Sequence, residues 1–340
     1  MCSNVRLEMN RSGNGPLFMN PDPEEARAFF QKKKVALTDK VMSVTEAVSQ
    51  LVNDGDYLGS GGFGTNRIAT AALHEIVRQK KRDLGFAGHT TTHDFQILSA
   101  GNRHDEKLLA RVDAAYIVGL EARGLSPQAR HVMQSGDVEV CEWTNYALAC
   151  RLQAAAMGVP FLPVRSMFGT DTFEHSAAKE IDCPFTGQKV VAVPALYPDV
   201  SVIHVHESDC LGNCRIYGIT MADLELARAS KRVIVTAEKI VSTDTIRERP
   251  YDTVIPSFCV DAVCEVPFGS YPGNMPSVYF SDEDHLKAWM SVETDAAAYD
   301  SFLQKHIYGV SDFAEYLALC GGQERMGLLR AQELNAEDTP

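Results

Sequence analysis

The sequence lacks the two glycine-rich patterns that most often mark nucleotide binding. It contains no G-x-x-x-x-G-K-S/T, and the spacing of the glycines at positions 59, 61, 62 and 64 does not produce G-x-G-x-x-G. The first pattern cradles the phosphates of a nucleoside triphosphate and the second those of a dinucleotide. The sequence therefore gives no motif evidence that the chain binds a nucleoside triphosphate or a dinucleotide.

Excess positive charge and long apolar runs are also absent. The 45 Asp and Glu residues outnumber the 32 Lys and Arg residues, which gives a formal net charge of -13. A chain this acidic is poorly suited to the phosphates of nucleic acids. No uninterrupted apolar segment is long enough for a secretory signal or a membrane span. We therefore expect a cytoplasmic protein whose partners are small molecules or proteins, with no nucleic acid and no membrane among them.

The sequence also has neither an even number of cysteines nor an internal repeat. The nine cysteines are an odd number that fits poorly with a closed disulfide framework, so we expect them to remain thiols. No segment recurs with a fixed period. The 340 residues, of which 45% are hydrophobic, are enough to bury a sizeable core in one large α/β domain or two smaller ones.

Short apolar runs alternate with amphipathic stretches from residue 41 onward, which is typical of an open, mostly parallel sheet with helices on both faces. The apolar runs predict strands at 84–87, 114–118, 138–141, 161–164, 190–193, 202–205, 233–236 and 259–266. Helices are predicted at 44–52, 68–82, 144–157, 222–230, 284–304 and 311–319. We assign residues 1–40 to an N-terminal extension, 41–322 to the α/β domain and 323–340 to a polar tail.

A glycine-rich turn is the most informative feature of the chain. Ser60-Gly61-Gly62-Phe63-Gly64 follows the apolar Tyr57-Leu58 and precedes an apolar stripe that begins at Ile68. A strand-to-helix turn of this kind presents backbone N–H groups with a favourable dipole, which suits a developing oxyanion or a phosphate. The same glycines also let a strand turn tightly beneath a packed helix, and the pattern by itself does not choose between the two.

Loops that follow the predicted strands are the other places to search for a site. Ligands of open α/β sheets lie beyond the carboxyl ends of the strands. Four such loops carry polar residues: 60–67, 88–94, 119–124 and 142–145. Because Thr, Asp and Asn also cap helices and form turns, each loop taken alone equally fits a local structural role.

Several stretches, in order along the chain, resemble the A subunit of family I coenzyme A transferases, and that of glutaconate CoA-transferase in particular. Asp54-Gly55, Gly61-Gly62-Phe63 and Arg67 are similar to the signature of this kind of subunit. The resemblance continues through 152–164, 190–194, 255–263 and 267–272, and so spans about residues 41–319. One departure is Ala69, which stands where the signature usually has proline. The resemblance implies the NagB/RpiA/CoA-transferase type of α/β fold.

The resemblance also implies an activity and a partner. Enzymes of this family move CoA between an acyl-CoA and a carboxylic acid, and a glutaconate-like dicarboxylate is the nearest analogy. Their glutamate nucleophile forms an acyl-glutamyl anhydride and then a glutamyl-CoA thioester. It lies in a Ser-Glu-Asn-Gly motif of the B subunit, and this sequence contains no such motif. We therefore expect a chain that is active only with a B subunit, in a heterodimer or a larger hetero-oligomer, with coenzyme A as substrate and no permanently bound cofactor.

The resemblance and the turn together indicate the candidate site residues of this chain. The candidate oxyanion or acyl-binding residues are Ser60, Gly61, Gly62, Phe63 and Gly64. The candidate substrate-binding residues are Arg67, His89, Thr90, Glu121 and Asn145.

Three of these candidates have a structural alternative. Arg67 either pairs with the second carboxylate of a dicarboxylic acyl group or is a solvated residue in the first turn of a helix. Glu121 either supplies a carboxylate to the cleft or forms structural hydrogen bonds. Asn145 either contacts substrate or begins a helix, and it occupies the point where related ring-cleaving CoA hydrolases carry a glutamate.

Three other functions remain open. The same fold serves A subunits of steroid-degrading, ring-cleaving CoA-thioester hydrolases and a branch of decarboxylases; Asn145 in place of a glutamate favours transfer over ring hydrolysis. From another class, His204-Val205-His206 followed by Cys210 and Cys214 suggests a non-catalytic metal-binding protein, since alternate strand residues share one face. The C-x-x-x-C spacing is not that of a usual zinc site, so we expect no metal.

Overall fold

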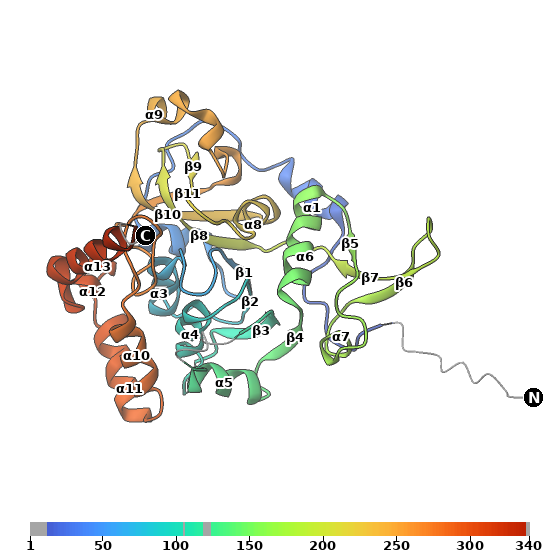
Figure 1. Ribbon diagram of the computed structural model, residues 1–340, viewed down its shortest axis with the longest axis horizontal. Coiled ribbons are helices and arrows are strands. Elements are labelled where there is room, and N and C mark those ends of the chain that lie inside the picture. Colours follow the sequence, from blue (N-terminus) through green and yellow to red (C-terminus); the bar gives the residue numbers. More distant parts are fainter. Residues whose placement is uncertain (1–11, 105, 118–123, 338–340) are drawn as a thin grey trace, which may run out of the picture.

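An eight-stranded sheet forms the centre of the molecule (Figure 1). The structure, a computed structural model, describes residues 12–104, 106–117 and 124–337. The strands of this sheet are β1 (Tyr57–Ser60), β2 (Leu84–Gly88), β3 (Leu109–Ala114), β4 (Glu139–Glu142), β8 (Val200–Ser208), β9 (Cys214–Arg215), β10 (Arg232–Ile240) and β11 (Ala262–Glu265). Their order is β11-β10-β8-β1-β2-β3-β4, all neighbours in this path are parallel, and β9 pairs antiparallel with β8.

Helices cover both faces of this sheet. One face packs against α2 (Val44–Leu51), α3 (Thr70–Arg78), α4 (His93–Ala100), α5 (Pro127–Gln134), α10 (Glu283–Val292) and α11 (Ala296–Leu303). The other face packs against α6 (Asn145–Met157) and α8 (Asp223–Ala229). Alternate residues of the strands supply the two cores: Val202 belongs to the first and Ile203 to the second. The predicted α/β class is confirmed.

A second, smaller sheet lies beside α6. It is antiparallel, with the order β5-β7-β6, and comprises β5 (Phe161–Val164), β7 (Lys189–Pro194) and β6 (Lys179–Asp182). Helix α7 (Asp171–Glu174) lies between β5 and β6 in the chain. The N-terminal extension, which includes α1 (Pro23–Phe30), docks here, since the N–H of Gly13 donates to the carbonyl of Ala178. The strands predicted at 161–164 and 190–193 therefore exist, but their assignment to the parallel sheet is wrong.

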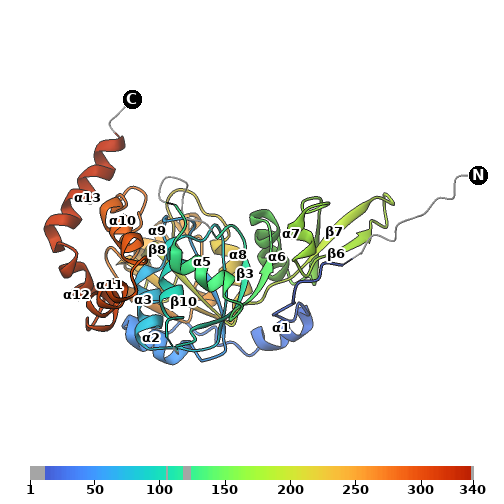
Figure 2. The same ribbon diagram turned by 90° about the horizontal axis from the view of Figure 1, so that it is seen from below.

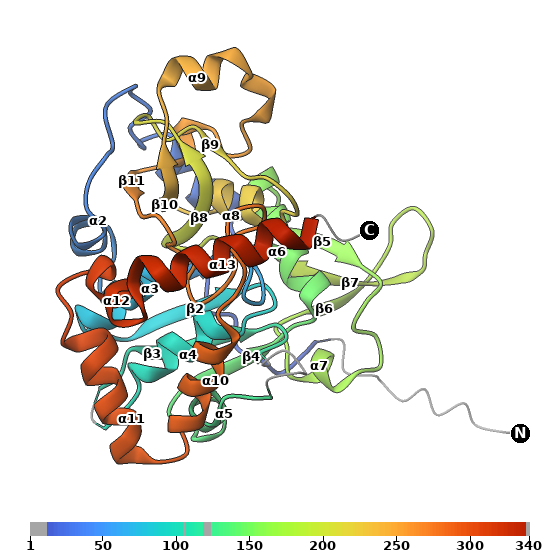
Figure 3. The same cartoon turned by 60° about the vertical axis from the view of Figure 1, so that its left-hand side comes forward.

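The C-terminal helices occupy the opposite end of the molecule (Figure 2). After α9 (Thr243–Glu248) and β11, the chain forms α10, α11, α12 (Phe313–Leu319) and α13 (Gly322–Glu337). Figure 3 shows α13 in front of the main sheet. Met326 and Leu329 of this helix are buried in a third apolar cluster with Phe268 and Tyr279. Where the structure describes them, the residues predicted to form a polar tail are thus part of a helix that packs through Met326 and Leu329 on this cluster. Among the described residues, no helix is both long and apolar enough to cross a membrane.

Two further predictions are corrected by buried polar side chains. The strand predicted at 114–118 is instead β3, which contains the buried Asp113. The carboxylate of Asp113 accepts hydrogen bonds from the Tyr57 hydroxyl and, at 2.5 Å, from the Trp143 indole, and it forms a 2.8 Å ion pair with Arg151. These contacts allow a charged residue inside a strand. The strand therefore lies before the predicted apolar run and ends at Ala114, where that run begins.

The helix predicted at 284–304 is divided in two at Glu293. This buried carboxylate accepts hydrogen bonds from Gln96 and Ser126, at 2.6 Å each. Asp295 then caps α11 by accepting the N–H of Ala298. The break thus places one buried acid against α4 and the start of α5.

Four histidines surround Trp289 and Tyr316 between α3, α4 and the C-terminal helices. The ring of His74 lies 4.6 Å from that of Tyr316, and the ring of His93 lies 4.9 Å from that of Trp289. His285 lies 5.7 Å from His306 and bonds the hydroxyl of Tyr316. Burial lowers the pKa of His74 well below its usual value and that of His285 to about 4. The folded protein therefore keeps both rings neutral near pH 6.

This cluster predicts a loss of stability in mild acid. Between pH 7 and pH 5 the unfolded chain takes up protons on His74 and His285 and the folded chain does not, so the free energy of unfolding falls as the pH falls. Each histidine that stays neutral contributes about 2 kcal/mol to this loss. His74→Phe should therefore reduce the loss by about that amount. Urea unfolding of both proteins at pH 7 and pH 5 measures it, with His104→Gln, an exposed position, as the control. An unchanged pH dependence in His74→Phe would contradict the assignment.

Candidate functional site

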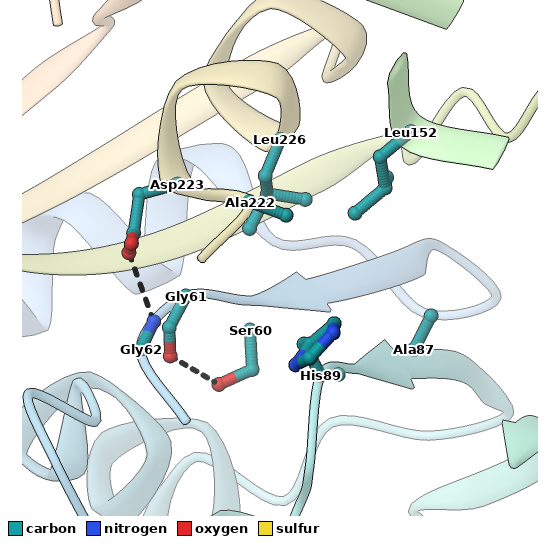
Figure 4. A pocket seen from close by; sticks show the side chains of 10 residues that line it. Ser60, Gly61, Gly62, Ala87, His89, Leu152, Ala222, Asp223 and Leu226 are labelled. Carbon is teal, nitrogen blue, oxygen red and sulfur yellow. Dashed lines mark hydrogen bonds between the residues drawn. The ribbon is translucent and has the colours of Figure 1, made fainter. Parts of the chain in front are cut away.

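A small pocket opens where the carboxyl ends of β1 and β2 meet α6 and α8 (Figure 4). Its lining residues are Ser60, Gly61, Gly62, Ala87, Gly88, His89, Leu152, Ala222, Asp223 and Leu226. Because β1 and β2 are parallel and Ser60 pairs with Gly88, both strands end at the same edge of the sheet. This is the edge at which ligands of open α/β sheets bind, and the glycine-rich turn begins there.

The backbone N–H groups of this turn are engaged within the chain. Their acceptors are the carbonyl of Val202 for Gly61 (2.9 Å), the Asp223 carboxylate for Gly62 (2.9 Å), the carbonyl of Asn66 for Phe63 (3.1 Å) and that of Thr90 for Gly64 (2.7 Å). The prediction that residues 61–64 present unpaired N–H groups is therefore wrong. Three of these acceptors come from β8, α8 and the loop after β2, so no local pattern predicted them, whereas Asn66 belongs to the turn itself. The polar side chains left at the pocket are Ser60 and His89, together with Asp223.

Arg67 is buried, so of its two alternatives that of a solvated residue in the first turn of a helix is wrong. Its side chain is fully shielded from solvent and forms an ion pair with Asp223, 3.0 Å from Nη2 to Oδ2 and 3.2 Å from Nη1 to Oδ1. Nη2 also donates to the carbonyl of Ile219 at 2.8 Å. The backbone of Arg67 has a left-handed φ of 56°. The carboxylate that Arg67 binds in this structure therefore belongs to its own chain.

Asp223 is the residue that sequence reasoning missed. It is the first residue of α8, and an acidic residue in the first turn of a helix is usually explained by the helix dipole. Here its carboxylate crosses to the turn after β1, where it accepts the N–H of Gly62 (Figure 4) and also pairs with Arg67. The two partners of this ion pair are 156 positions apart, so no spacing in the sequence linked them.

Three of the predicted substrate-binding residues do converge. The side-chain oxygen of Asn145 accepts the N–H of Thr90 at 3.3 Å, and the Thr90 hydroxyl lies 3.1 Å from Nδ1 of His89. The carbonyl of Thr90 in turn accepts the N–H of Gly64. Burial lowers the pKa of His89, which keeps its ring neutral at pH 7. Asn145 is the first residue of α6, and Thr144 provides the cap. Glu121 lies outside the described residues.

A second buried acid lies close to the pocket. Asp94, at the start of α4, accepts the N–H groups of Thr92 at 2.8 Å and Phe95 at 2.9 Å. Burial raises the pKa of Asp94 to about 6, while a hydrogen bond from Ser60 acts in the opposite direction. The loop 88–94 was recognised as a candidate loop, but nothing in its sequence distinguished this residue from an ordinary cap.

The histidines suspected of binding a metal have protein partners instead. Nδ1 of His204 lies 2.8 Å from the Thr236 hydroxyl, and its Nε2 lies 2.9 Å from Glu238. His206 accepts the N–H of Tyr217 at Nδ1 and so donates from Nε2 to the carbonyl of Pro276. Both ring nitrogens of each histidine thus have a partner within the protein and are not free to bind a metal ion. Among the described residues, no group of three or more His, Cys, Asp or Glu side chains is arranged to hold a metal ion.

Comparison with known protein families identifies the class of protein to which this fold and candidate site belong. The chain belongs to the coenzyme A transferase family, whose model matches residues 41–266. The resemblance inferred from the motifs is thus confirmed, and with it the type of fold.

Among the proteins that it resembles are the A subunits of two such enzymes. It is 32% identical to the A subunit of glutaconate CoA-transferase from Acidaminococcus fermentans, over 85% of this chain and 94% of that protein. It is 34% identical to the A subunit of 3-oxoadipate CoA-transferase from Pseudomonas knackmussii, over 82% of this chain and 97% of that one. The crystal structure of the A. fermentans glutaconate CoA-transferase superimposes with a TM-score of 0.81 and covers 86% of this chain and 95% of its own.

The alternative functions also have counterparts among the relatives. The cholesterol ring-cleaving hydrolase IpdA subunit of Mycobacterium tuberculosis is 26% identical over 83% of this chain and 97% of its own length. The crystal structure of the decarboxylase AibA/AibB has a TM-score of 0.69 at 31% identity and covers 79% of this chain and 100% of that one. The hydrolase is thus a more distant relative than the two transferase subunits.

The geometry of the turn predicts that substitutions of Gly62 and Gly64 reduce the stability of the protein by different amounts. Gly62 has a φ of 75°, and a Cβ there would lie 2.5 Å from the carbonyl oxygen of Asn66, whereas Gly64, with a φ of 60°, has open space. Gly64→Ala should cost about 1–2 kcal/mol of stability from the left-handed backbone alone. Gly62→Ala should cost a further 1–3 kcal/mol or so, because the backbone itself must move. Denaturant unfolding of the two variants compares them, and equal losses would show that the turn does not have this shape.

Proposed function

We propose that this chain is the A subunit of a heteromeric CoA transferase. It would move CoA between an acyl-CoA and a carboxylic acid, through a glutamyl-CoA intermediate on a partner B subunit. The observation that supports this most strongly is the similarity to two CoA-transferase A subunits over 94% and 97% of their lengths. The relatives' names place glutaconate and 3-oxoadipate among the acids that such enzymes use.

The composition of the pocket supports the need for a partner. Among its described lining residues there is no glutamate, and the only carboxylate, that of Asp223, is held by Arg67 and Gly62. A nucleophilic carboxylate must be free to attack the thioester carbon and release CoA thiolate. The CoA thiolate must then attack the glutamyl carbon of the resulting anhydride and release the first acid. The described side of the pocket offers no group for these steps, so the nucleophile would come from the B subunit.

Apolar side chains at the same edge support a docking surface for that partner. Tyr146, which follows Asn145, is 62% exposed, and Ile219, whose carbonyl binds Arg67, is 64% exposed. Met221, beside Asp223, is also exposed. Large apolar residues gathered at one rim usually mark an interface. A B subunit seated there would close the pocket against water.

This chain's contribution to the chemistry would come from Ser60 and His89. The N–H groups at 61–64 are engaged, which leaves the Ser60 hydroxyl and the neutral His89 ring as the polar side chains that could reach the acyl group. The Ser60 hydroxyl donates to the carbonyl of Gly61 at 3.4 Å in this structure and would turn from that long contact to the thioester oxygen. A hydroxyl aimed at the thioester oxygen stabilises the negative charge that develops there during attack. The role of the glycine-rich turn in the reaction would then be to hold Ser60 at the pocket.

The first test is trapping of the intermediate. The chain is co-expressed with a candidate B subunit encoded beside it, incubated with a panel of acyl-CoAs, reduced with borohydride and analysed by mass spectrometry. A reduced glutamate on the partner, with acetate-dependent exchange of CoA, is the expected result. CoA release without an adduct or an acceptor would favour the hydrolase, loss of carbon dioxide would favour the decarboxylase, and failure to form a complex would contradict the proposed hetero-oligomer.

The proposed role of Ser60 predicts a specific loss of rate. Ser60→Ala should lower kcat by about 100-fold, since removal of one donor to a developing oxyanion typically has an effect of this size. KM should change little, because the interaction forms mainly in the transition state. Steady-state kinetics of the complex measure both constants, and Ser291→Ala, at an exposed position on α10, is the matched control. A variant that raises KM and leaves kcat unchanged would show that Ser60 only binds substrate.

A further inference from the structure

A groove runs along the face of α8 that points away from the candidate site. Leu224 and Arg228, one turn apart on this helix, line the groove, whereas Asp223 and Leu226 line the pocket at the glycine-rich turn. The groove consists of two adjoining hollows of about 680 Å³ and about 370 Å³, which share Arg228 and Phe258 in their linings. Pockets that bind small molecules commonly have volumes of about 300–1,000 Å³. The groove is therefore large enough for a small organic ligand.

Apolar side chains make up more than half of the residues that line the larger hollow. Leu224 of α8 and Ile246 of α9 lie on two sides of it, and Val254 and Phe258 follow in the segment after α9. Leu37 of the N-terminal extension also lines it and is 72% exposed, while Phe258 is 53% exposed. Large apolar side chains that gather around a hollow and remain in contact with water are typical of binding surfaces. An apolar chain laid in the groove would cover them.

Arg228 places a positive charge where the two hollows meet. It is exposed, and it forms no ion pair with any residue that the structure describes. Two other cations line the groove but have acidic partners: Lys33 pairs with Asp261 at 2.8 Å, and Arg247 pairs with Asp244 at 3.1 Å. A guanidinium group binds a carboxylate through two parallel N–H donors. Arg228 is thus placed to bind the charged end of an anion whose apolar part lies in the groove.

We propose that this groove is a binding site for an amphiphilic anion, whose charged group pairs with Arg228 and whose apolar chain lies along Leu224, Ile246 and Val254. A carboxylate with an unbranched aliphatic chain is the simplest ligand of this class. The inference goes beyond the proposed transfer of CoA and does not depend on it, since the groove and the pocket at the turn have no lining residue in common.

Decanoate and decyltrimethylammonium are the matched probes, because both carry a linear ten-carbon chain and differ in the sign of their charge. Isothermal titration calorimetry of the full chain, below the concentrations at which either probe forms micelles, measures the two Kd values. The net charge of -13 favours the cation at non-specific sites. We nevertheless expect one decanoate per chain, with a Kd at least about tenfold lower than that of the cation.

Butyrate tests the contribution of the apolar chain. It keeps the carboxylate of decanoate and has six fewer CH₂ groups, each of which strengthens binding by about fourfold when fully buried. Because the groove leaves part of a ligand in contact with water, butyrate should bind at least about 30-fold more weakly than decanoate. None of these comparisons needs a variant.

Two variants at exposed positions then locate the site. Arg228→Gln should weaken decanoate binding by about tenfold through loss of charge-assisted hydrogen bonds, and should leave decyltrimethylammonium unaffected. Leu37→Ser should weaken it by about fivefold through loss of apolar contact. Arg130→Gln on α5 and Leu328→Ser on α13 are the matched controls, because both side chains are exposed outside the groove. Both controls should bind decanoate as wild type does.

The remaining outcomes each contradict the inference. It is overturned if decanoate shows no saturable binding, or binds no more tightly than decyltrimethylammonium or butyrate. Decanoate binding that either groove variant leaves unchanged also overturns it, because the ligand then lies elsewhere, such as at the candidate site. The titration is repeated on the complex with the B subunit, where loss of binding would show that the groove is a subunit contact rather than a ligand site. None of these outcomes bears on CoA transfer, which the trapping experiment tests separately.

Discussion

The buried ion pair between Arg67 and Asp223 is the interaction on which the candidate site depends. It joins the turn after β1 to the first residue of α8, two segments 156 positions apart in the chain. Burying two charges is costly unless further hydrogen bonds accompany the pair. The N–H of Gly62 and the carbonyl of Ile219 supply two such bonds, so contacts that stabilise the ion pair also set the position of the turn.

A second buried ion pair holds the other wall of the pocket. Asp113 of β3 binds Arg151 of α6, and the guanidinium also lies 4.1 Å above the ring of Trp143. Leu152, the next residue of α6, lines the pocket. Each helix that borders the pocket is thus attached to the sheet edge by a fully buried salt bridge, one from α8 and one from α6. An arrangement of this kind keeps a site rigid, because neither helix can shift without separating charges away from water.

The elements that the sequence predicted well are those in which burial follows local pattern. Continuous apolar runs correctly marked β2, β4, β8 and β10, and the helix predicted at 44–52 is α2, which begins behind a capping box of Ser43 and Glu46. The misassigned elements depend on distant partners. Asp113 makes β3 look polar until Trp143 and Arg151 are placed beside it. The helix α13 looks like a tail until Met326 and Leu329 meet the third apolar cluster.

By itself, the sequence determined the fold class, the family and the edge of the sheet where the candidate site lies. Those properties follow from residue types at short spacing, and His89, Thr90 and Asn145 converge there as the order of parallel strands requires. Only the tertiary structure decided which partners the polar groups of that edge take. It gave the N–H groups of Gly61, Gly62 and Gly64 acceptors from three other segments, and it gave Arg67 the carboxylate of Asp223. The physical reason is that a buried donor or charge must be satisfied by whichever group the packed chain brings within reach, and that group need not be near in sequence.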